Sequence, residues 1–306
     1  MAKIIVAGGT GNLGTKLIEG FLANGDEVYV LSRQKRRTEN PKLNYVLWDG
    51  EHMDSWTAVL EGADTLINLS GASINRVFNE ENKSLLRESR VRPTSVLGKA
   101  IQQANNPPRL WINASGVSIF NGKEELMDEE STDFGNDFLA NLAKDWEAAC
   151  LKWETPKTHQ VILRIAPVLM TGSGMFAELY PLAKLGLAGT VGSGKQIVSW
   201  ILLDDFLRLI PWIISLNEPD PVYHACSPNP LSNEEFMKTI RSVAGSPVGL
   251  PLPSFMAKIG ARVKGVDPTL LLESVPVTTK LTLERGFKFN FPYLQPALQQ
   301  LILKST

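Results

Sequence analysis

The residues best suited to bind a ligand form a glycine-rich run near the start of the chain, Gly8-Gly9-Thr10-Gly11-Asn12-Leu13-Gly14. The run follows an apolar segment at residues 3–7 and precedes apolar residues at helical spacing, which predicts a strand-to-helix turn. There Gly8 permits a tight reversal, Gly11 lets the backbone approach a pyrophosphate, and Gly14 lets helix and strand pack closely. The turn predicts a dinucleotide site, and a glycine-rich turn without a ligand is the alternative. Its cofactor-binding candidates are Gly8, Thr10, Gly11, Asn12, Leu13 and Gly14.

The end of the second predicted strand, residues 27–31, indicates which dinucleotide is bound. An NAD site usually places an acid about twenty residues after the glycines, where it bonds the ribose 2′-hydroxyl. Here the strand ends in Ser32-Arg33-Gln34-Lys35-Arg36-Arg37, which contains no acid. Because a guanidinium can form paired hydrogen bonds with a 2′-phosphate, we predict NADP(H), with NAD(H) as second choice. The expected ligands are Ser32, Arg33, Lys35 and Arg36, and a solvated basic loop is the alternative.

Composition argues against several other classes of function. The 306 residues carry 31 Lys and Arg against 32 Asp and Glu, which disfavours nucleic acid or an anionic membrane as the main partner. Two cysteines are too few for a disulfide framework, and three histidines without ligand spacing predict no metal site. Neither a signal peptide nor an apolar run of membrane-spanning length is evident. We expect a soluble cytoplasmic protein with a small-molecule substrate, and a homodimer stays an open alternative.

Predicted strands alternate with helices through the first half of the chain. Strands are expected at residues 43–48, 65–69, 110–114 and 161–165, with one helix ending near residue 104 and another starting near residue 137. This rhythm predicts an α/β fold, a doubly wound parallel Rossmann sheet with a smaller C-terminal substrate lobe. Glycine-rich loops then precede a strand at 197–202 and a helix at 206–214. The expected dinucleotide-binding domain is 1–170 plus about 197–225, and the smaller lobe is 171–196 plus 226–306.

Short motifs spread over nearly the whole chain resemble one protein family. Besides the glycine turn they are Asn68-Leu69-Ser70-Gly71-Ala72, Ser89-Arg90-Val91, Ala114-Ser115-Gly116-Val117, Asp137-Phe138-Leu139-Ala140 with Trp146-Glu147, Leu163-Arg164-Ile165, Gly192-Ser193-Gly194-Lys195-Gln196, Ser199-Trp200-Ile201, Asp204-Asp205, Ser227-Pro228-Asn229-Pro230, Asn233-Glu234-Glu235-Phe236 and Gly286-Phe287-Lys288-Phe289. Together they resemble the extended short-chain dehydrogenase/reductase superfamily, specifically its atypical branch of sugar-nucleotide epimerase-related proteins with an appended C-terminal domain. The resemblance implies an NAD(P)-binding lobe whose cofactor crosses the carboxyl ends of the strands.

Two further segments become cofactor-binding candidates through this resemblance. Leu69, Ser70, Gly71 and Ala72 follow the fourth strand, where small residues let the chain pass under the adenine-side ribose and donate backbone N–H groups. Tight packing is the alternative reason for their small size. Asp49 ends the third strand, where its carboxylate can accept a hydrogen bond from the adenine amino group or cap its own loop.

The resemblance also implies a catalytic tyrosine, with a lysine four residues later, on the helix near residue 137. The lysine lowers the pKa of the phenol, so that the tyrosine exchanges a proton with an alcohol while nicotinamide C4 exchanges a hydride. In this chain the expected pair falls on Leu139 and Ala143, or on Phe138 and Leu142 one residue earlier. Neither pair transfers protons.

Any catalysis therefore needs other groups to act as acid and base. Ser115 and Ser118 follow the fifth strand, near the expected nicotinamide, and the sequence does not decide which of them faces a substrate. Neither hydroxyl is basic without a partner. The acidic segment at residues 124–137 can supply a desolvated carboxylate, although acidic loops are usually solvated. Its carboxylates include Asp128, Glu129, Glu130 and Asp133.

Substrate contacts are expected from three residues. Lys195 lies in a glycine-rich loop that resembles a segment holding the phosphate of a nucleotide sugar, and an ordinary connection explains the loop equally well. Arg164 ends the sixth strand and pairs either with a substrate anion or with a neighbouring carboxylate. Trp200 is expected to line the pocket, with core packing as the alternative.

Two functions of different classes follow from these residues. The first is an NADP-dependent epimerase or reductase that acts on a nucleotide sugar or a related hydroxyl or carbonyl compound, with an improvised acid or base. The second is a non-catalytic regulatory or scaffold protein that senses NADP. The intact glycine turn favours the first function, and the missing tyrosine and lysine favour the second.

Overall fold

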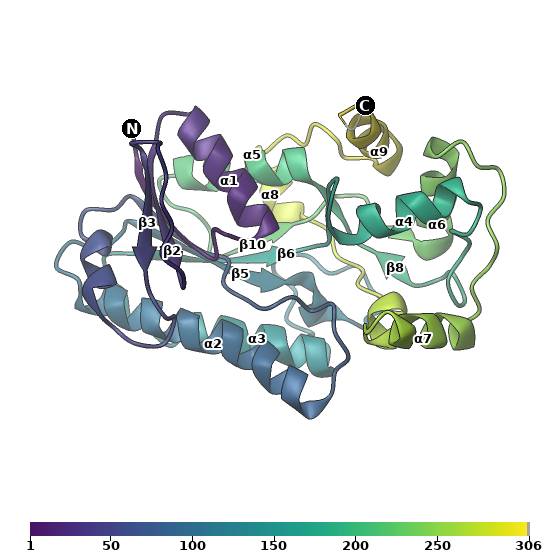
Figure 1. Cartoon of the computed structure of the whole chain (residues 1–306), viewed down its shortest axis with the longest axis horizontal. Coiled ribbons are helices and arrows are strands. Elements are labelled where there is room, and N and C mark those ends of the chain that lie inside the picture. The colour runs from purple at the N-terminus through teal and green to yellow at the C-terminus, as the bar shows by residue number, and fades with distance from the viewer. Residues whose placement is uncertain (305–306) are drawn as a thin grey trace.

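The computed structural model describes residues 1–304 of the chain. Its centre is a seven-stranded parallel sheet in the order β10-β6-β5-β4-β1-β2-β3 (Figure 1). The strands are β1 (Lys3–Ala7), β2 (Glu27–Ser32), β3 (Leu43–Leu47), β4 (Thr65–Asn68), β5 (Leu110–Gly116), β6 (His159–Ile165) and β10 (Val222–Ala225). The predicted Rossmann sheet is confirmed. Because the chain crosses from β3 to β4 on the far side of β1, the switch point lies between β1 and β4, where ligands bind in such sheets.

Helices cover both faces of this sheet. They are α1 (Asn12–Ala23) and α5 (Leu203–Ser215) on one face, and α2 (Glu80–Gln103), α3 (Phe138–Leu151) and the 3-10 helix η1 (Ser55–Leu60) on the other. In β1, Ile4 and Val6 pack in the α1 and α5 layer, while Ile5 packs in the α2 layer. This burial on both faces explains the nearly continuous apolar sequence of the strand.

A smaller lobe extends from one end of the sheet (Figure 1). It contains α4 (Gly174–Lys184), α6 (Asn233–Val243), α7 (Ser254–Val263), α9 (Leu294–Leu303), and the pairs β8 (Ile197–Val198) with β11 (Leu231–Ser232) and β7 (Val168–Leu169) with β9 (Ile201–Leu202). The strand expected at 197–202 is thus two short strands in two separate sheets. Its interruption comes from Ser199, whose hydroxyl bonds the carbonyls of Val275 and Val277, and from Trp200, which turns into the lobe's core.

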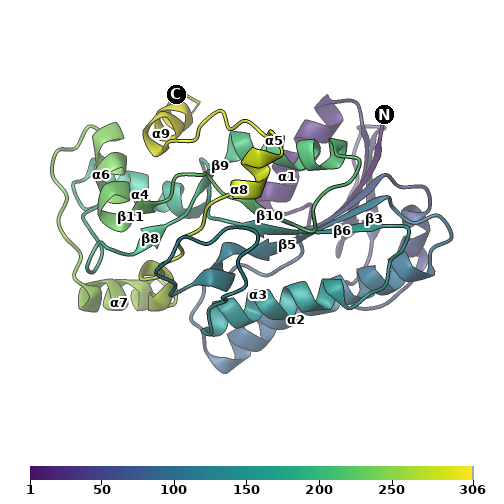
Figure 2. The ribbon, with the colours of Figure 1, turned by 180° about the vertical axis from the view of Figure 1, so that it is seen from behind.

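The chain crosses between the two parts more than once. After the 3-10 helix η3 (Pro268–Leu271), the chain returns to the main sheet, where α8 (Lys280–Glu284) lies beside α5 and β10 (Figure 2). Phe287 then packs in the core between that sheet and the layer of α1 and α5. The smaller lobe thus includes β7, β8 and β9, which lie within the predicted dinucleotide-binding domain, whereas Phe287 of the predicted lobe packs against the main sheet. The predicted boundaries stay a prediction, and residues 305 and 306 of the predicted lobe lie outside the described part. No helix within residues 1–304 is long and apolar enough to cross a membrane.

Candidate functional site

The glycine turn between β1 and α1 is built differently at each glycine. Gly8 has a φ of +76°, and a Cβ there would lie 2.6 Å from the backbone carbonyl carbon of Leu69. A Cβ on Gly14 would lie 2.6 Å from the Cα of Gly9, so packing of the protein itself excludes side chains at both positions. At Gly11 the nearest atom would be 3.4 Å away, and within the described chain no side chain caps α1. Open space at a free helix N-terminus matches a site for a pyrophosphate.

The segment after β4 lies against this turn, and hydrogen bonds from its own backbone N–H groups fix its position. The N–H groups of Leu69, Ser70 and Ala72 donate to the carbonyl of Ala7, to Asn68 and to Ser89, at distances of 2.9, 3.1 and 3.0 Å. These amides are therefore not free for the ribose contact expected of them. The Ser70 hydroxyl, in contrast, is buried without a hydrogen-bond partner among residues 1–304. An unpaired buried hydroxyl beside Gly8 fits a cofactor oxygen better than it fits an empty interior.

The basic end of β2 leaves several exposed cations available. The Ser32 hydroxyl is buried and bonded to the backbone of Gln34, so it shapes its own turn. Arg33 and Lys35 are exposed, and neither side chain has a hydrogen-bond or ion-pair partner in the described part of the chain. Arg36 lies over the ring of Tyr45, 6.0 Å from its centroid. Arg37 is likewise exposed and has no side-chain partner within residues 1–304, so Arg33, Lys35 and Arg37 together carry the positive charge that can recognise a 2′-phosphate.

Asp49 lies in the loop after β3. Its carboxylate accepts hydrogen bonds from the N–H groups of Glu51 and His52, at 2.7 and 2.8 Å, and from the His52 ring, at 2.7 Å. These bonds, led by the one from the His52 backbone, lower the pKa of Asp49 to about 2. The geometry matches the loop-cap alternative, and the adenine contact stays a prediction.

The two candidate serines after β5 have different surroundings. Ser115 is buried, and its hydroxyl donates a 2.7 Å hydrogen bond to Oε1 of Glu147 on α3. Ser118, on the 3-10 helix η2 (Val117–Phe120), is half-buried, and its hydroxyl has no hydrogen-bond partner within residues 1–304. Of the two serines, Ser118 is therefore the one free to contact a substrate.

Arg164 belongs to a buried network and does not face a substrate. Its Nε and Nη2 atoms donate to the two carboxylate oxygens of Glu147 at 2.8 and 2.9 Å, and its guanidinium lies 5.2 Å from the ring centroid of Phe120 and 5.2 Å from that of Phe134. The guanidinium also lies near the His224 ring, whose pKa is lowered by burial. Of the two partners expected for Arg164, the structure shows the neighbouring carboxylate.

The positions on α3 where a tyrosine and lysine were expected are apolar and occupied. Leu139 and Ala143 are buried, and the Phe138 ring packs against Phe78 with centroids 5.0 Å apart. Lys144, one residue later, donates to the carbonyl of Gly135 at 3.0 Å. No tyrosine–lysine pair therefore exists on the described residues of this helix.

The four carboxylates named in the acidic segment are all engaged, and its Glu124 and Glu125 are exposed to solvent. Glu129 is buried, but its carboxylate accepts hydrogen bonds from the Thr279 and Thr282 hydroxyls and from the Leu281 N–H, which fixes the start of α8. The other three carboxylates are also bonded: Asp128 to Ser131, Glu130 to Lys280 and Asp133 to Lys123. The prediction of a desolvated base in this segment is therefore not supported.

An isolated carboxyl group does exist, but it comes from a distant part of the chain. Glu273 follows η3, and its Oε1 atom is buried without a hydrogen-bond partner among the described residues. Burial, and secondly the carboxylate of Asp137, raise the pKa of Glu273 to about 8. No feature of the sequence identifies this residue, because neither periodicity nor a local motif marks a glutamate that tertiary contacts bury.

The predicted substrate residues of the smaller lobe are only partly available. Trp200 is fully buried in the lobe's core and donates from Nε1 to the carbonyl of Asn229, so its assignment to the pocket is wrong. Large aromatic rings gain more from such burial than from a solvated cleft. Lys195 is exposed, but the N–H groups at 192, 194 and 195 bond within their own surroundings. Only the Lys195 side chain is left to contact a phosphate.

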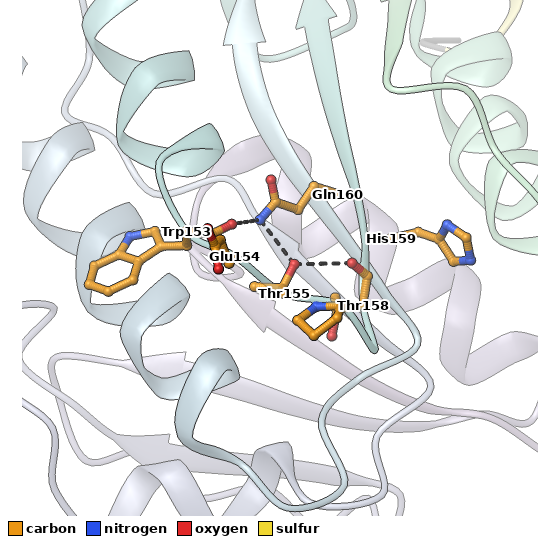
Figure 3. Close-up of a pocket in the computed structure, with 7 residues that line it drawn as sticks. Trp153, Glu154, Thr155, Thr158, His159 and Gln160 are labelled. Carbon is orange, nitrogen blue, oxygen red and sulfur yellow. Dashed lines mark hydrogen bonds between the residues drawn. The ribbon is translucent and has the colours of Figure 1, made fainter.

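A surface hollow of about 550 Å³ lies elsewhere, between the end of α3 and the start of β6 (Figure 3). Gln160 donates to the carbonyl of Trp153 and to the Thr155 hydroxyl, which in turn donates to the carbonyl of Thr158. These polar groups that line the hollow are thus hydrogen-bonded to one another. The hollow is at the amino ends of the strands, opposite the edge where the cofactor site lies, so we exclude it as the functional site.

Comparison with known proteins agrees with this geometry. The family model for the NAD dependent epimerase/dehydratase family matches residues 4–226. "Epimerase family protein SDR39U1" of Homo sapiens is 30% identical over 305 residues, which cover 98% of this chain and 99% of the human one. The crystal structure of that human protein (isoform2) with NADPH has a TM-score of 0.84 and covers 98% of both chains. A nucleoside-diphosphate sugar epimerase from Corynebacterium glutamicum has a TM-score of 0.78 at 26% identity, with 98% of this chain and 58% of that one covered.

Proposed function

This chain belongs to the NAD dependent epimerase/dehydratase family, and on that premise we propose that it is an NADP(H)-binding epimerase or reductase. Its substrate is a nucleotide sugar or a related compound with a hydroxyl or carbonyl group. When bound, the nicotinamide supplies hydride transfer at its C4 atom. The observation that carries the proposal is the open backbone of Gly11 at the start of α1, beside the switch point of the sheet.

Several features of the site support NADP(H) as the cofactor. The unpaired Ser70 hydroxyl lies across from Gly8, so a polar ligand atom there would satisfy a buried group. Arg33 and Lys35 carry uncompensated charge at the end of β2, where the ribose of a dinucleotide is expected. The human relative was crystallised with NADPH.

The substrate class has weaker but independent support. The C. glutamicum neighbour is described as a nucleoside-diphosphate sugar epimerase. In this chain Ser118 supplies a free hydroxyl at the end of β5, and Lys195 supplies a cation in the smaller lobe. We assign to Ser118 a hydrogen bond to the reacting oxygen and to Lys195 a contact with phosphate. A cytoplasmic location and a homodimer are also part of the proposal.

Titration calorimetry with NADPH and NADH tests the cofactor assignment. The wild type should prefer NADPH, and Arg33→Asp should weaken NADPH binding by about 1–3 kcal/mol, the range for a charged hydrogen bond, while sparing NADH. Arg262→Asp is the matched control, because Arg262 is exposed on α7 in the other lobe. If neither dinucleotide bound to the wild type, the proposed function would fail.

Stopped-flow absorbance of the reduced nicotinamide, measured across a panel of sugar nucleotides, tests turnover. We expect at least one compound to oxidise NADPH or to reduce NADP⁺. Silence across the panel, with NADPH binding established, would contradict the enzymatic part of the proposal and leave cofactor binding intact.

The apolar residues on α3 favour a second candidate function. Leu139 and Ala143 are buried where an acid and its lysine would stand, which fits a non-catalytic regulatory or scaffold protein that senses NADP. Such a protein should capture different partners, or different amounts of one partner, in its unliganded, oxidised and reduced forms. Identical capture by all three forms would contradict it.

A further inference from the structure

Glu273 has the features of a reactive group and no structural role that explains them. Buried polar side-chain atoms nearly always have a partner, and the few exceptions call for an explanation. The buried Oε1 of Glu273 lacks a partner within residues 1–304, and burial together with the Asp137 carboxylate raises the pKa of Glu273 to about 8. Unlike Glu129, which caps a helix, Glu273 stabilises no element with that oxygen.

The backbone around Glu273 is tied to the end of β5. The N–H of Ser274 donates to Oδ1 of Asn121 at 3.1 Å, and the N–H of Gly122 donates to the carbonyl of Ser274 at 2.9 Å. Asn121 directly follows η2, the turn that carries Ser118. Glu273 is thus next to a residue held against the loop where the reacting oxygen is expected.

The same asparagine ties Glu273 to the start of α3. The Asn121 side chain donates to the carboxylate of Asp137, which caps α3 by accepting from the N–H of Ala140. This helix is the one on which the family resemblance places the tyrosine. Two hydrogen bonds therefore connect Ser274 to Asp137, and the carboxylate of Asp137 is also the charge that raises the pKa of Glu273.

The residues on either side of Glu273 contact the smaller lobe. The Ser274 hydroxyl accepts from the N–H of Ile197 in β8, and a Cβ on Gly192 would lie 3.2 Å from the Leu272 side chain. Both flanking residues therefore face the smaller lobe. By contrast, the charge that acts on the Glu273 carboxyl is that of Asp137, the residue that caps α3.

We propose that Glu273 is the proton-exchanging residue that replaces the missing tyrosine, an inference that rests on the proposed function. In the reductive direction the substrate carbonyl carbon accepts a hydride from the reduced nicotinamide, and the carbon–oxygen π bond breaks. The carbonyl oxygen takes the proton of the Glu273 carboxyl and becomes a hydroxyl. The products are an alcohol, NADP⁺ and the Glu273 carboxylate, which regains a proton from water. Oxidation of an alcohol runs through the same steps in reverse.

The other groups near the site are less suited to this step. Ser115 is engaged by Glu147, and Asp128, Glu129, Glu130 and Asp133 of the acidic segment are bonded to neighbours. Ser118 is free, but an isolated hydroxyl is far too weak an acid or base at neutral pH. A carboxyl group that stays protonated near neutral pH gives up and recovers its proton close to the working pH, which is the condition for efficient general catalysis.

The fluorescence of bound NADPH, recorded from pH 6 to pH 10, tests the position of Glu273 without requiring a substrate. In the wild type we expect a titration with a midpoint about pH 8, because a charge forms beside the nicotinamide. Glu273→Gln should bind NADPH and lose this titration, while Glu273→Asp should retain one. Glu125→Gln, an exposed control in the loop before α3, should match the wild type.

The outcomes separate the two proposals. A titration that persists in Glu273→Gln would place Glu273 away from the nicotinamide and overturn the inference, with NADP(H) binding unaffected. Absence of NADPH binding in the wild type would overturn the proposed function first. Melting temperature verifies that Glu273→Gln is folded. Infrared difference spectra of the unliganded protein should show one protonated carboxyl at pH 7 that is absent from Glu273→Gln, and its presence in the variant would also refute the assignment.

Kinetics with any sugar nucleotide that turns over give the final test. Loss of a general acid should lower kcat in Glu273→Gln by a factor of about 100 or more, with little change in KM. In Glu273→Asp the pH profile should keep an ionisation that Glu273→Gln lacks. An unchanged kcat in Glu273→Gln would refute the proton-exchanging role.

Discussion

Ser115 and Glu147 are joined inside the fold by a 2.7 Å hydrogen bond from the serine hydroxyl to Oε1 of the glutamate. The same carboxylate binds the guanidinium of Arg164 at both of its oxygens. The serine at the end of β5 therefore completes a buried ion pair. Ser118, whose hydroxyl has no partner in the described chain, is left to face a substrate.

The two serines should respond differently to alanine. Ser115→Ala removes a hydrogen bond to a buried charge and should lower the free energy of unfolding by about 1.5–3 kcal/mol. Ser118→Ala should change it by less than about 0.5 kcal/mol, because no contact is lost, and should reduce turnover instead. Urea denaturation measures both values. Equal losses of stability would contradict the assignment of the two roles.

The buried ion pair should matter far more than an exposed one on the same helix. Glu147→Gln leaves the Arg164 charge buried and uncompensated, so we expect the free energy of unfolding to fall by about 3–5 kcal/mol. Asp145→Asn is the matched control, because Asp145 pairs with Arg87 on the surface and its loss should cost about 1 kcal/mol or less. Urea denaturation of both variants makes the comparison. Similar costs would show that the Glu147–Arg164 pair is not desolvated as the structure describes.

Two glycines of the turn separate folding from cofactor binding. Gly8→Ala places a Cβ against Leu69 at a positive φ and should destabilise the protein by more than about 1 kcal/mol. Gly11→Ala meets only ordinary contacts, so stability should stay within about 0.5 kcal/mol. Its added methyl group should nevertheless weaken NADPH by at least about 1.4 kcal/mol, a factor of ten. Thermal unfolding measures the change in stability, and titration calorimetry measures the change in NADPH affinity. Full NADPH affinity in Gly11→Ala would show that the turn does not contact the cofactor.

Stability should depend on pH through Glu273. Its pKa is about 8 in the folded protein against an ordinary value of 4.5, chiefly because it is buried. The contribution of Glu273 to the free energy of unfolding is complete below pH 4.5. As the pH rises from there to the folded-state pKa, this contribution declines by up to about 1.4 kcal/mol per pH unit. Glu273→Gln should therefore be increasingly more stable than the wild type between pH 4.5 and 8, with a constant difference above. Chemical denaturation at several pH values measures this, and a flat difference, as expected for Glu125→Gln, would show that the carboxyl is solvated.

The sequence predicted the parts of the site that depend on neighbouring residues. The turn at Gly8 to Gly14, its position between a strand and a helix, and the basic end of β2 were all recognisable locally. The parallel sheet followed from the alternation of apolar strands and helices. The seventh strand, β10, was not predicted, because its four residues, Val-Tyr-His-Ala, contain no continuous run of aliphatic side chains.

Side-chain partners could not be predicted in the same way. Whether Arg164 meets a substrate or Glu147, whether Trp200 lines a pocket or a core, and which serine is free all depend on contacts between elements. Either alternative for Arg164 and Trp200 was consistent with the sequence. Packing decided between them, because α3 places a carboxylate against β6 and the smaller lobe closes around the indole.

The sequence by itself thus determined that this chain builds a phosphate-binding turn on a doubly wound sheet, and that the helix starting near residue 137 has no tyrosine followed four residues later by a lysine. Turn geometry and strand burial are set within a few residues, so a local pattern is enough to specify them. Only the tertiary structure decided that the isolated carboxyl beside the site is Glu273, more than 130 residues beyond Asp137. Desolvation is a property of everything packed around a group, and no local pattern contains it.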